Sequence, residues 1–257
     1  MSIVDRRLAG EFIKAVGTRV DVARWAWQEA DVPPPESVLD EVRCDQDARG
    51  AFAASWEPGR PSVDGTCERL AVLEDLGRIQ TRTASRALDY LADRVGADGR
   101  VDEVHTPDDV AAAWATPGDT RDGLARTALA GYWLAIDQRP EAHAAAQVLA
   151  HQLATRGTVG SPAVEAVTFS LFSLTGRRTF AQTVASDLVR ALGGMDADQL
   201  AWLGWSLVVA GQPAEHEVLA TTKDLLSTMQ AEDGRWPSTS GHDVAVTLAA
   251  LRTLSDR

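Results

Sequence analysis

The feature that most constrains the fold is a series of amphipathic helical segments separated by helix breakers. Apolar residues recur at spacings of three and four, Ala, Leu, Glu and Arg dominate, and alternating β-branched or aromatic runs are nearly absent. Breakers interrupt this pattern at fairly regular intervals: VPPP at 32–35, GRPS at 59–62, GADG at 96–99, TPGD at 116–119, GSP at 160–162, GG at 193–194 and GRWPSTSG at 234–241. The sequence therefore predicts an all-α protein.

The helical segments fall into five similar pairs, each with a charged first helix, a loop containing glycine and a more apolar second helix. The first helices are predicted at 36–44, 83–95, 140–154, 179–192 and 215–229. The second helices are predicted at 64–77, 122–135, 163–176, 196–211 and 242–254. Their register is set by aligning Thr66, Thr127, Val167 or Thr168, Trp202 and Thr247. We expect the second helices to lie inside the first, in an open solenoid or a closed ring.

Two of the loops share the pattern Q-x-x-x-G-x-aromatic: QDARGAF at 46–52 and QAEDGRW at 230–236. Shorter remnants, GRV and GTV, occur at 99–101 and 157–159. The pattern resembles the QW motif of the terpene cyclase and protein prenyltransferase superfamily, which includes squalene-hopene and oxidosqualene cyclases. In that family the glutamine contacts a neighbouring outer-helix terminus and the aromatic ring stacks against it.

The resemblance implies a fold and a domain organisation. It implies an α/α toroid of about five helical hairpins over residues 36–257, similar to the β-domain of class II terpene cyclases. Residues 1–35 are then an N-terminal helical extension that packs on the barrel.

The segment SVDGTC, residues 62–67, stands at the head of the first of these second helices. It resembles the D-x-D-D-T-A motif of class II terpene cyclases, with Asp64 and Thr66 retained but Ser62 and Gly65 in place of the flanking aspartates. Oxidosqualene cyclases, with a V-S-D-C-T-A-E pattern, also keep the single acid and continue with a glutamate that matches Glu68. By resemblance, Asp64 is the Brønsted acid that protonates an alkene or epoxide. Such an acid must be neutral, which desolvation at the mouth of an apolar cavity favours.

The resemblance also implies supporting residues. Donors such as Cys or His stabilise the conjugate base of the catalytic aspartate in that family, and Cys67 and His242 are the candidates here. A carbocation needs a dry cavity lined by aromatic faces. Six aromatic residues on the predicted second helices are candidates for this substrate-binding role: Tyr132, Trp133, Phe169, Phe172, Trp202 and Trp205.

The function implied is protonation-initiated cyclisation of a linear isoprenoid or prenylated substrate by a class II terpene cyclase-like enzyme. No cofactor is required, although a substrate with a diphosphate group would recruit Mg²⁺. Class II enzymes place their site between two helical domains. A homodimer or a partner cyclase domain is therefore expected to complete the site of this chain.

Simpler explanations stand beside each of these roles. Asp64, Asp122 and Asp243 all begin predicted second helices, where an aspartate commonly caps the helix. Cys44 and Cys67 are most simply small buried hydrophobic residues. His242 is most simply a solvated loop residue, and the six aromatic residues most simply belong to the core. Four further acids are most simply solvated loop carboxylates: Asp45, Asp47, Asp108 and Asp109.

Two alternative functions stay open. The first is a non-catalytic toroid that binds an apolar ligand or serves as a partner subunit, since two of the three motif aspartates are replaced. The second is a prenyltransferase-like zinc enzyme, for which Asp64, Cys67 and His242 are the right residue types at the wrong spacing. No DDxxD or NSE-like cluster is present, and Asp108-Asp109 lacks a third carboxylate.

Composition excludes other classes of partner. The formal net charge is −12 and the basic residues are scattered, which argues against nucleic acid and against docking on anionic lipid. Two cysteines are too few for a disulfide framework, and the N-terminus has no apolar signal region, so a cytoplasmic location is expected. No run of 18 apolar residues occurs, so no transmembrane segment is expected.

Overall fold

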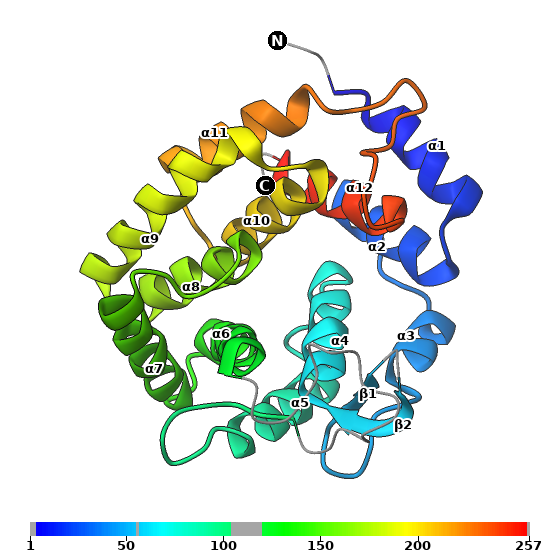
Figure 1. Cartoon of the computed structure of the whole chain (residues 1–257). Helices are drawn as coiled ribbons and strands as arrows, with labels where there is room; N and C mark the ends of the chain where they lie inside the picture. The colour runs from blue at the N-terminus through cyan, green and yellow to red at the C-terminus, as the bar shows by residue number, and fades with distance from the viewer. Residues whose placement is uncertain (1–3, 55–56, 104–119, 256–257) are drawn as a thin grey trace. The chain divides into compact units, whose positions relative to one another are not determined.

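The computed structural model describes residues 4–54, 57–103 and 120–255. Across these residues the chain forms twelve α-helices, one short 3₁₀ helix, η2 (Leu192–Gly194), and a two-stranded sheet (Figure 1). The all-α class predicted from helical periodicity is confirmed.

The five predicted pairs of helices are all present, with ends within a few residues of the predicted ones. The first helices of the pairs are α3 (Glu36–Arg43), α5 (Arg82–Asp93), α7 (Glu141–Arg156), α9 (Arg178–Ala191) and α11 (Glu217–Ser227). The second helices are α4 (Val63–Asp75), α6 (Thr120–Ile136), α8 (Pro162–Leu174), α10 (Ala197–Val209) and α12 (Asp243–Thr253). Ahead of them, α1 (Arg6–Val16) and α2 (Arg19–Ala30) form a further pair.

The chain divides into two compact units, and the second unit comprises residues 40–182. Within it the second helices pack in series, because α4 contacts α6 and α6 contacts α8. The first helices α5 and α7 each contact the second helices on either side of them in the chain. The interior is built from the apolar faces of these helices, with Leu70, Leu134 and Leu149 fully buried.

The first unit combines residues 1–39 with residues 183–257. Here α12 contacts α10, α1 and α2, so the first and last helices of the chain share one core. The N-terminal segment thus continues the series as another helical pair. The domain boundary expected at residues 35 and 36 stays a prediction.

Glycines in three loops bring the chain against the helix of the next pair. Gly50, Gly99 and Gly234 have φ angles of +97°, +81° and +87°. A Cβ on Gly50 would lie 2.1 Å from the Arg86 carbonyl oxygen of α5, and one on Gly234 would lie 2.4 Å from the Leu8 carbonyl carbon of α1. Only glycine permits both the backbone angle and the approach.

The same loops are hydrogen-bonded to threonines of the following second helix. The backbone N–H of the residue two positions after each glycine donates to a threonine Oγ1 at 3.0 or 3.1 Å: Phe52 to Thr66, Val101 to Thr127, and Trp236 to Thr247. These are three of the residues that set the register of the pairs in the sequence. The structure confirms that they occupy equivalent positions.

The two glutamines of the Q-x-x-x-G loops contact the first helix of another pair, as the motif implies. Gln230 Nε2 donates to the Asp5 carbonyl at 3.0 Å, and its Oε1 accepts from the Asp5 N–H at 2.8 Å. Asp5 is the N-cap of α1. Gln46 Nε2 donates to the Thr83 carbonyl in the first turn of α5 at 2.8 Å. The Trp236 indole donates to the Leu226 carbonyl at 2.8 Å, so it is held by α11.

A small β-hairpin between α3 and α4 is not predicted by the sequence pattern. Strands β1 (Phe52–Ala54) and β2 (Glu57–Ser62) pair antiparallel, with Phe52 opposite Ser62 and Ala53 opposite Pro61. The segment has no alternating apolar pattern and contains two prolines, which are tolerated because both strands are edge strands. The hairpin delivers the chain to the start of α4.

Candidate functional site

Helix α4 begins at a dense group of hydrogen bonds. Ser62 is the N-cap, and its Oγ accepts from the Gly65 N–H at 3.1 Å. The buried carboxylate of Glu103 accepts from Ser62 Oγ at 2.7 Å and from the N–H groups of Val63 and Asp64 at 3.1 and 3.2 Å. Because free N–H groups and the helix dipole favour an anion there, Glu103 stabilises the first turn of α4.

Asp64 lies in this first turn, with its side chain 16% exposed. Its Oδ2 is 4.0 Å from Nη1 of Arg126, a residue of α6 whose side chain is 2% exposed. A guanidinium at this distance, shielded from water, favours the negatively charged form of a carboxyl group. Asp64 therefore combines limited solvent access with a cation that stabilises its conjugate base.

Neither of the two aspartates that the structure describes is an N-cap residue, although both stand in the first turn of a helix, where a negative charge suits the helix dipole. Ser62, not Asp64, caps α4. The N-cap of α12 is His242, while Asp243 accepts from the Ser238 N–H at 2.6 Å and pairs with Arg235 at 2.7 Å. The side chain of Asp122 lies outside the described residues, as do Asp108 and Asp109. A helix cap does not account for Asp64.

Cys67 lies one helical turn after Asp64 and is 1% exposed. Burial raises the pKa of its thiol well above the ordinary value, and the charges of Asp64, Glu103 and Glu68 raise it further. Cys67 is therefore a neutral thiol, able to act only as a weak donor. Cys44, which the sequence also suggested to be buried, is exposed, and its thiol donates a hydrogen bond to Asp45 Oδ1 at 3.1 Å.

His242 belongs to a different unit from the other two candidate site residues. It is part of the unit formed by residues 1–39 and 183–257, whereas Asp64 and Cys67 belong to residues 40–182. Its side chain is exposed, and its backbone N–H donates to Ser238 Oγ at 3.0 Å. Its role as a partner of Asp64 stays a prediction.

The six aromatic residues proposed to line a cavity are mostly buried. Tyr132, Trp133, Phe169, Phe172 and Trp205 are each at most 3% exposed, and Trp202 is half-buried. Tyr132 meets Trp133 edge to face, and Trp202 stacks on Trp205, both with ring centroids 5.3 Å apart. Their burial is typical of core residues. That they bind a substrate stays a prediction.

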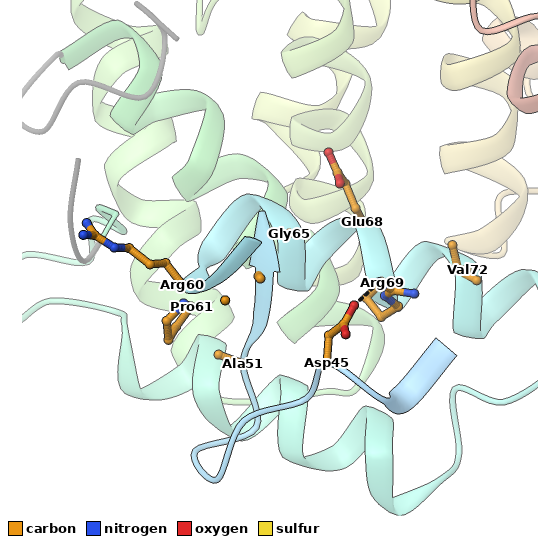
Figure 2. A pocket seen from close by; sticks show the side chains of 10 residues that line it. Asp45, Ala51, Arg60, Pro61, Gly65, Glu68, Arg69 and Val72 are labelled. Atoms are coloured by element: carbon orange, nitrogen blue, oxygen red, sulfur yellow. Dashed lines mark ion pairs between the residues drawn. The ribbon is translucent and has the colours of Figure 1, made fainter. Parts of the chain in front are cut away.

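A pocket of about 500 Å³ lies beside the start of α4, between the 45–51 loop, β1, β2 and one face of the helix (Figure 2). Gly65, Glu68 and Val72 line its helical wall. Asp45 Oδ2 is 3.5 Å from Arg69 Nη2. Figure 2 shows these two side chains facing one another, while Glu68 points away from them. Asp64 is not among the lining residues, so this pocket opens on a neighbouring face of α4.

Two residues of the site, Glu103 and Arg126, were not found from the sequence. Arg126 could have been recognised, because it is a charged residue in an otherwise apolar stretch of α6, next to the register residue Thr127. Glu103 could not, since it follows a loop and meets α4 only through the fold. Both act on the residue that the motif did identify.

The described residues contain no group of three or more His, Cys, Asp or Glu side chains arranged to hold a metal ion. The zinc alternative built on Asp64, Cys67 and His242 thus gains no support from this part of the chain. Within the same residues, every helix is too short or too polar to cross a bilayer.

Comparison with known proteins finds similarity in structure but not in sequence. No protein-family model matches the chain. No curated protein matches it by sequence. Among solved structures, the chain is similar to the type II terpene cyclase MstE from Scytonema in its apo form, with a TM-score of 0.55 and 13% identity over 97% of this chain and 86% of that one. At this identity the likeness shows the fold alone, which is the all-α toroid class that the QW-like loops imply.

Proposed function

We propose that the chain is a class II terpene cyclase-like enzyme in which Asp64 protonates a linear isoprenoid or prenylated substrate. The observation that carries the proposal is the setting of Asp64. Glu103 accepts hydrogen bonds from the Ser62 hydroxyl and from the Asp64 N–H at the start of α4. The Asp64 carboxyl group is partly buried and lies beside Arg126. The likeness in fold to a type II terpene cyclase supports this assignment.

Residues of this chain supply the acid and the groups that support it. Asp64, in its neutral form, transfers a proton to a terminal alkene or epoxide, and a carbocation forms on the substrate. Ring closure moves this charge along the substrate chain, and loss of another proton or capture of water ends the reaction. Arg126 offsets the negative charge that develops on Asp64 as the proton leaves. The buried thiol of Cys67 supplies a second, weaker donor on the same helix.

The test is incubation with geranyl, farnesyl and geranylgeranyl diphosphates, squalene and prenylated aromatics in D₂O. Because the proton comes from an exchangeable carboxyl group, a cyclic product closed by proton loss gains one deuteron. Asp64→Asn should lower turnover by at least about 100-fold, the usual contribution of a general acid. Mass spectrometry of the products measures both effects.

Asp243→Asn is the matched control. Asp243 also stands in the first turn of a second helix and also pairs with an arginine, at 2.7 Å. It should keep turnover within about threefold, since its carboxylate binds Ser238 and Arg235 in a structural contact. Full turnover by Asp64→Asn, or a cyclic product without deuterium, would remove Asp64 as the acid.

One observation favours the second candidate, a non-catalytic toroid that binds an apolar ligand or completes another protein's site. Arg126 favours the carboxylate form of Asp64, whereas proton transfer starts from the neutral form. If no isoprenoid is turned over by the wild type and an apolar compound co-purifies with it, this second function replaces the first.

A further inference from the structure

We propose that a groove between α6, α7 and the 157–160 loop binds a small anion that carries phosphate groups. The groove consists of two adjoining pockets of about 470 and 280 Å³, which share Arg100, Leu124 and Gln152 as lining residues. We call it the arginine groove. It lies within residues 40–182 and is built from residues that the proposed cyclisation does not use.

The larger pocket has walls from three segments of the chain. Arg156 and Gln152 stand one turn apart on α7, so they face the same side of the helix. Arg100 comes from the loop that follows α5, and Thr158 and Gly160 from the loop that follows α7. The floor is apolar, formed by Leu124 and Val159, which are 7% and 2% exposed.

The charge of the groove is opposite to that of the protein. The chain carries a formal charge of −12, yet Arg100 and Arg156 are the only charged residues that line the larger pocket within the described part of the chain. The smaller pocket adds His151 and one carboxylate, Asp98. Arg177 donates to Gln147, another lining residue, at 2.7 Å and brings a third guanidinium to its edge. Such a site selects anions against a repulsive background.

Two acidic side chains near the groove have contacts of their own. Asp98 accepts from the backbone N–H of Arg100 at 3.1 Å, and its other oxygen forms an ion pair with Arg100 Nε at 3.7 Å. This ion pair offsets part of the Arg100 charge, but at 3.7 Å it is not a hydrogen bond, so the guanidinium can still donate to a ligand. Glu165 contacts the Thr158 hydroxyl at 3.2 Å and is not a lining residue.

The backbone around Arg100 is held before any ligand binds. Gly99 packs so closely on α7 that a Cβ would lie 2.6 Å from the Ala144 carbonyl oxygen. Val101 donates its N–H to Thr127 Oγ1 of α6 at 3.0 Å. Arg100 therefore projects from a backbone fixed on both sides, so only its side chain has to be ordered on binding.

The residue types indicate the class of ligand. Guanidinium groups bind phosphate through paired hydrogen bonds, and two of them from different segments of the chain suit a ligand with more than one negative charge. The volume admits a diphosphate with a small organic group on the apolar floor. We therefore expect a phosphate-bearing anion to bind more tightly than a polycarboxylate of similar charge.

The test is isothermal titration of the full chain with inorganic pyrophosphate at low ionic strength, with citrate as the comparison anion. Pyrophosphate should bind with one-to-one stoichiometry and weaken as salt is added. The double variant Arg100→Gln, Arg156→Gln should weaken binding at least about tenfold, the usual effect of losing hydrogen bonds to a charged group. No heat with pyrophosphate, or equal affinity for citrate, would overturn the proposal.

The matched control is the double variant Arg82→Gln, Arg178→Gln. Both residues are exposed arginines of the same unit outside the groove, so the change in net charge is identical. This control should bind like the wild type, and an equal loss would show a general charge effect and overturn the site. Hydrogen exchange of the wild type should show protection at 157–160 on addition of pyrophosphate. Asp64→Asn should bind pyrophosphate normally, so the proposal stands or falls independently of the cyclase function.

Discussion

Asp64 and Asp243 have the same side chain, but their neighbouring residues give them different roles. Both lie in the first turn of a second helix and both face an arginine. Asp243 holds the loop before α12 through Ser238, whereas Asp64 lies on a helix start already satisfied by Glu103. The chemistry expected of Asp64 follows from Glu103 and Arg126, neither of which is near it in sequence.

The influence of Arg126 on Asp64 is measurable in the pH dependence of cyclisation. Activity requires neutral Asp64, so it falls as pH rises and the proton is lost. Without the positive charge of Arg126, the carboxylate form of Asp64 is less stable. Arg126→Gln should therefore shift the limb of the pH profile over which activity falls to higher pH.

Arg126→Lys is the control, since it keeps the charge and should restore most of the wild-type profile. Both variants are measured as kcat/KM against pH, with circular dichroism to confirm that they fold. A limb that stays in place or moves to lower pH in Arg126→Gln would show that Arg126 does not act on the acid.

The two cysteines should differ in reactivity because the thiolate is the reactive form. Burial raises the pKa of Cys67 well above its ordinary value, and it is 1% exposed. The pKa of Cys44 is also raised, by its hydrogen bond to Asp45, but Cys44 is exposed. Iodoacetamide on the native protein should label Cys44 first, at a rate that increases with pH, and Cys67 only after unfolding. Peptide mass spectrometry follows both sites, and early labelling of Cys67 would contradict its burial.

At the scale of elements, the same contact between a glycine loop and two helices recurs, and we call this contact the joint. In each of three loops a glycine with positive φ lies against a first helix, and the residue two positions later bonds a threonine of the second helix. The joint fixes where each second helix starts. It therefore sets the position of Asp64 on α4 and of Arg126 on α6.

Gly234→Ala tests this joint in the loop that packs on α1. Alanine there must adopt a φ of +87° and would place its Cβ 2.4 Å from the Leu8 carbonyl carbon. We expect a loss of about 3 kcal/mol in the free energy of unfolding, from the sum of backbone strain and steric overlap. Gly211→Ala is the control, because Gly211 has a φ of +69° but no described atom within 4 Å of the point where a Cβ would lie.

Gly211→Ala should cost only about 1 kcal/mol, the contribution of the backbone angle alone. Urea denaturation of both variants gives the comparison. Equal losses would mean that the close approach to α1 contributes nothing.

At the scale of the whole molecule, the ends of the chain meet in one unit. Residues 1–39 and 183–257 pack together, and α12 contacts both α1 and α2. Gln230 binds both backbone groups of Asp5, and Arg6 Nη1 lies 3.5 Å from the Leu251 carbonyl. The N-terminal helices are therefore part of the core of this unit.

Removal of residues 1–30 should lower the free energy of unfolding by at least about 3 kcal/mol, because it exposes apolar surface of α12 to water. The double variant Arg7→Ala, Glu11→Ala is the control. This ion pair on α1 has side chains 70% and 57% exposed, so its loss should change stability by less than about 0.5 kcal/mol. A truncated protein with an unchanged denaturation midpoint would show that α1 and α2 are a separate extension.

Much of the fold was predictable because its signals are local. Helical periodicity and breakers located the five pairs, and the spacing of glycine, aromatic residue and threonine placed the loops on their helices. The pairing of strands 52–54 and 57–62 was missed, since these short edge strands carry no alternating pattern. The N-terminal helices were expected to pack on the barrel, but α12 was not identified as their partner, because no local motif marks contacts between the two ends of a chain.

The candidate acid could be identified from local sequence, because the motif around Asp64 is contiguous and stands at the head of a predicted helix. The surroundings of that acid could be identified only in the folded chain. Glu103 binds the first turn of α4 and Arg126 approaches from α6, and both contacts join residues far apart in the chain. The protonation of a carboxyl group depends on burial and on charges within a few ångströms, and these are properties of the packed chain.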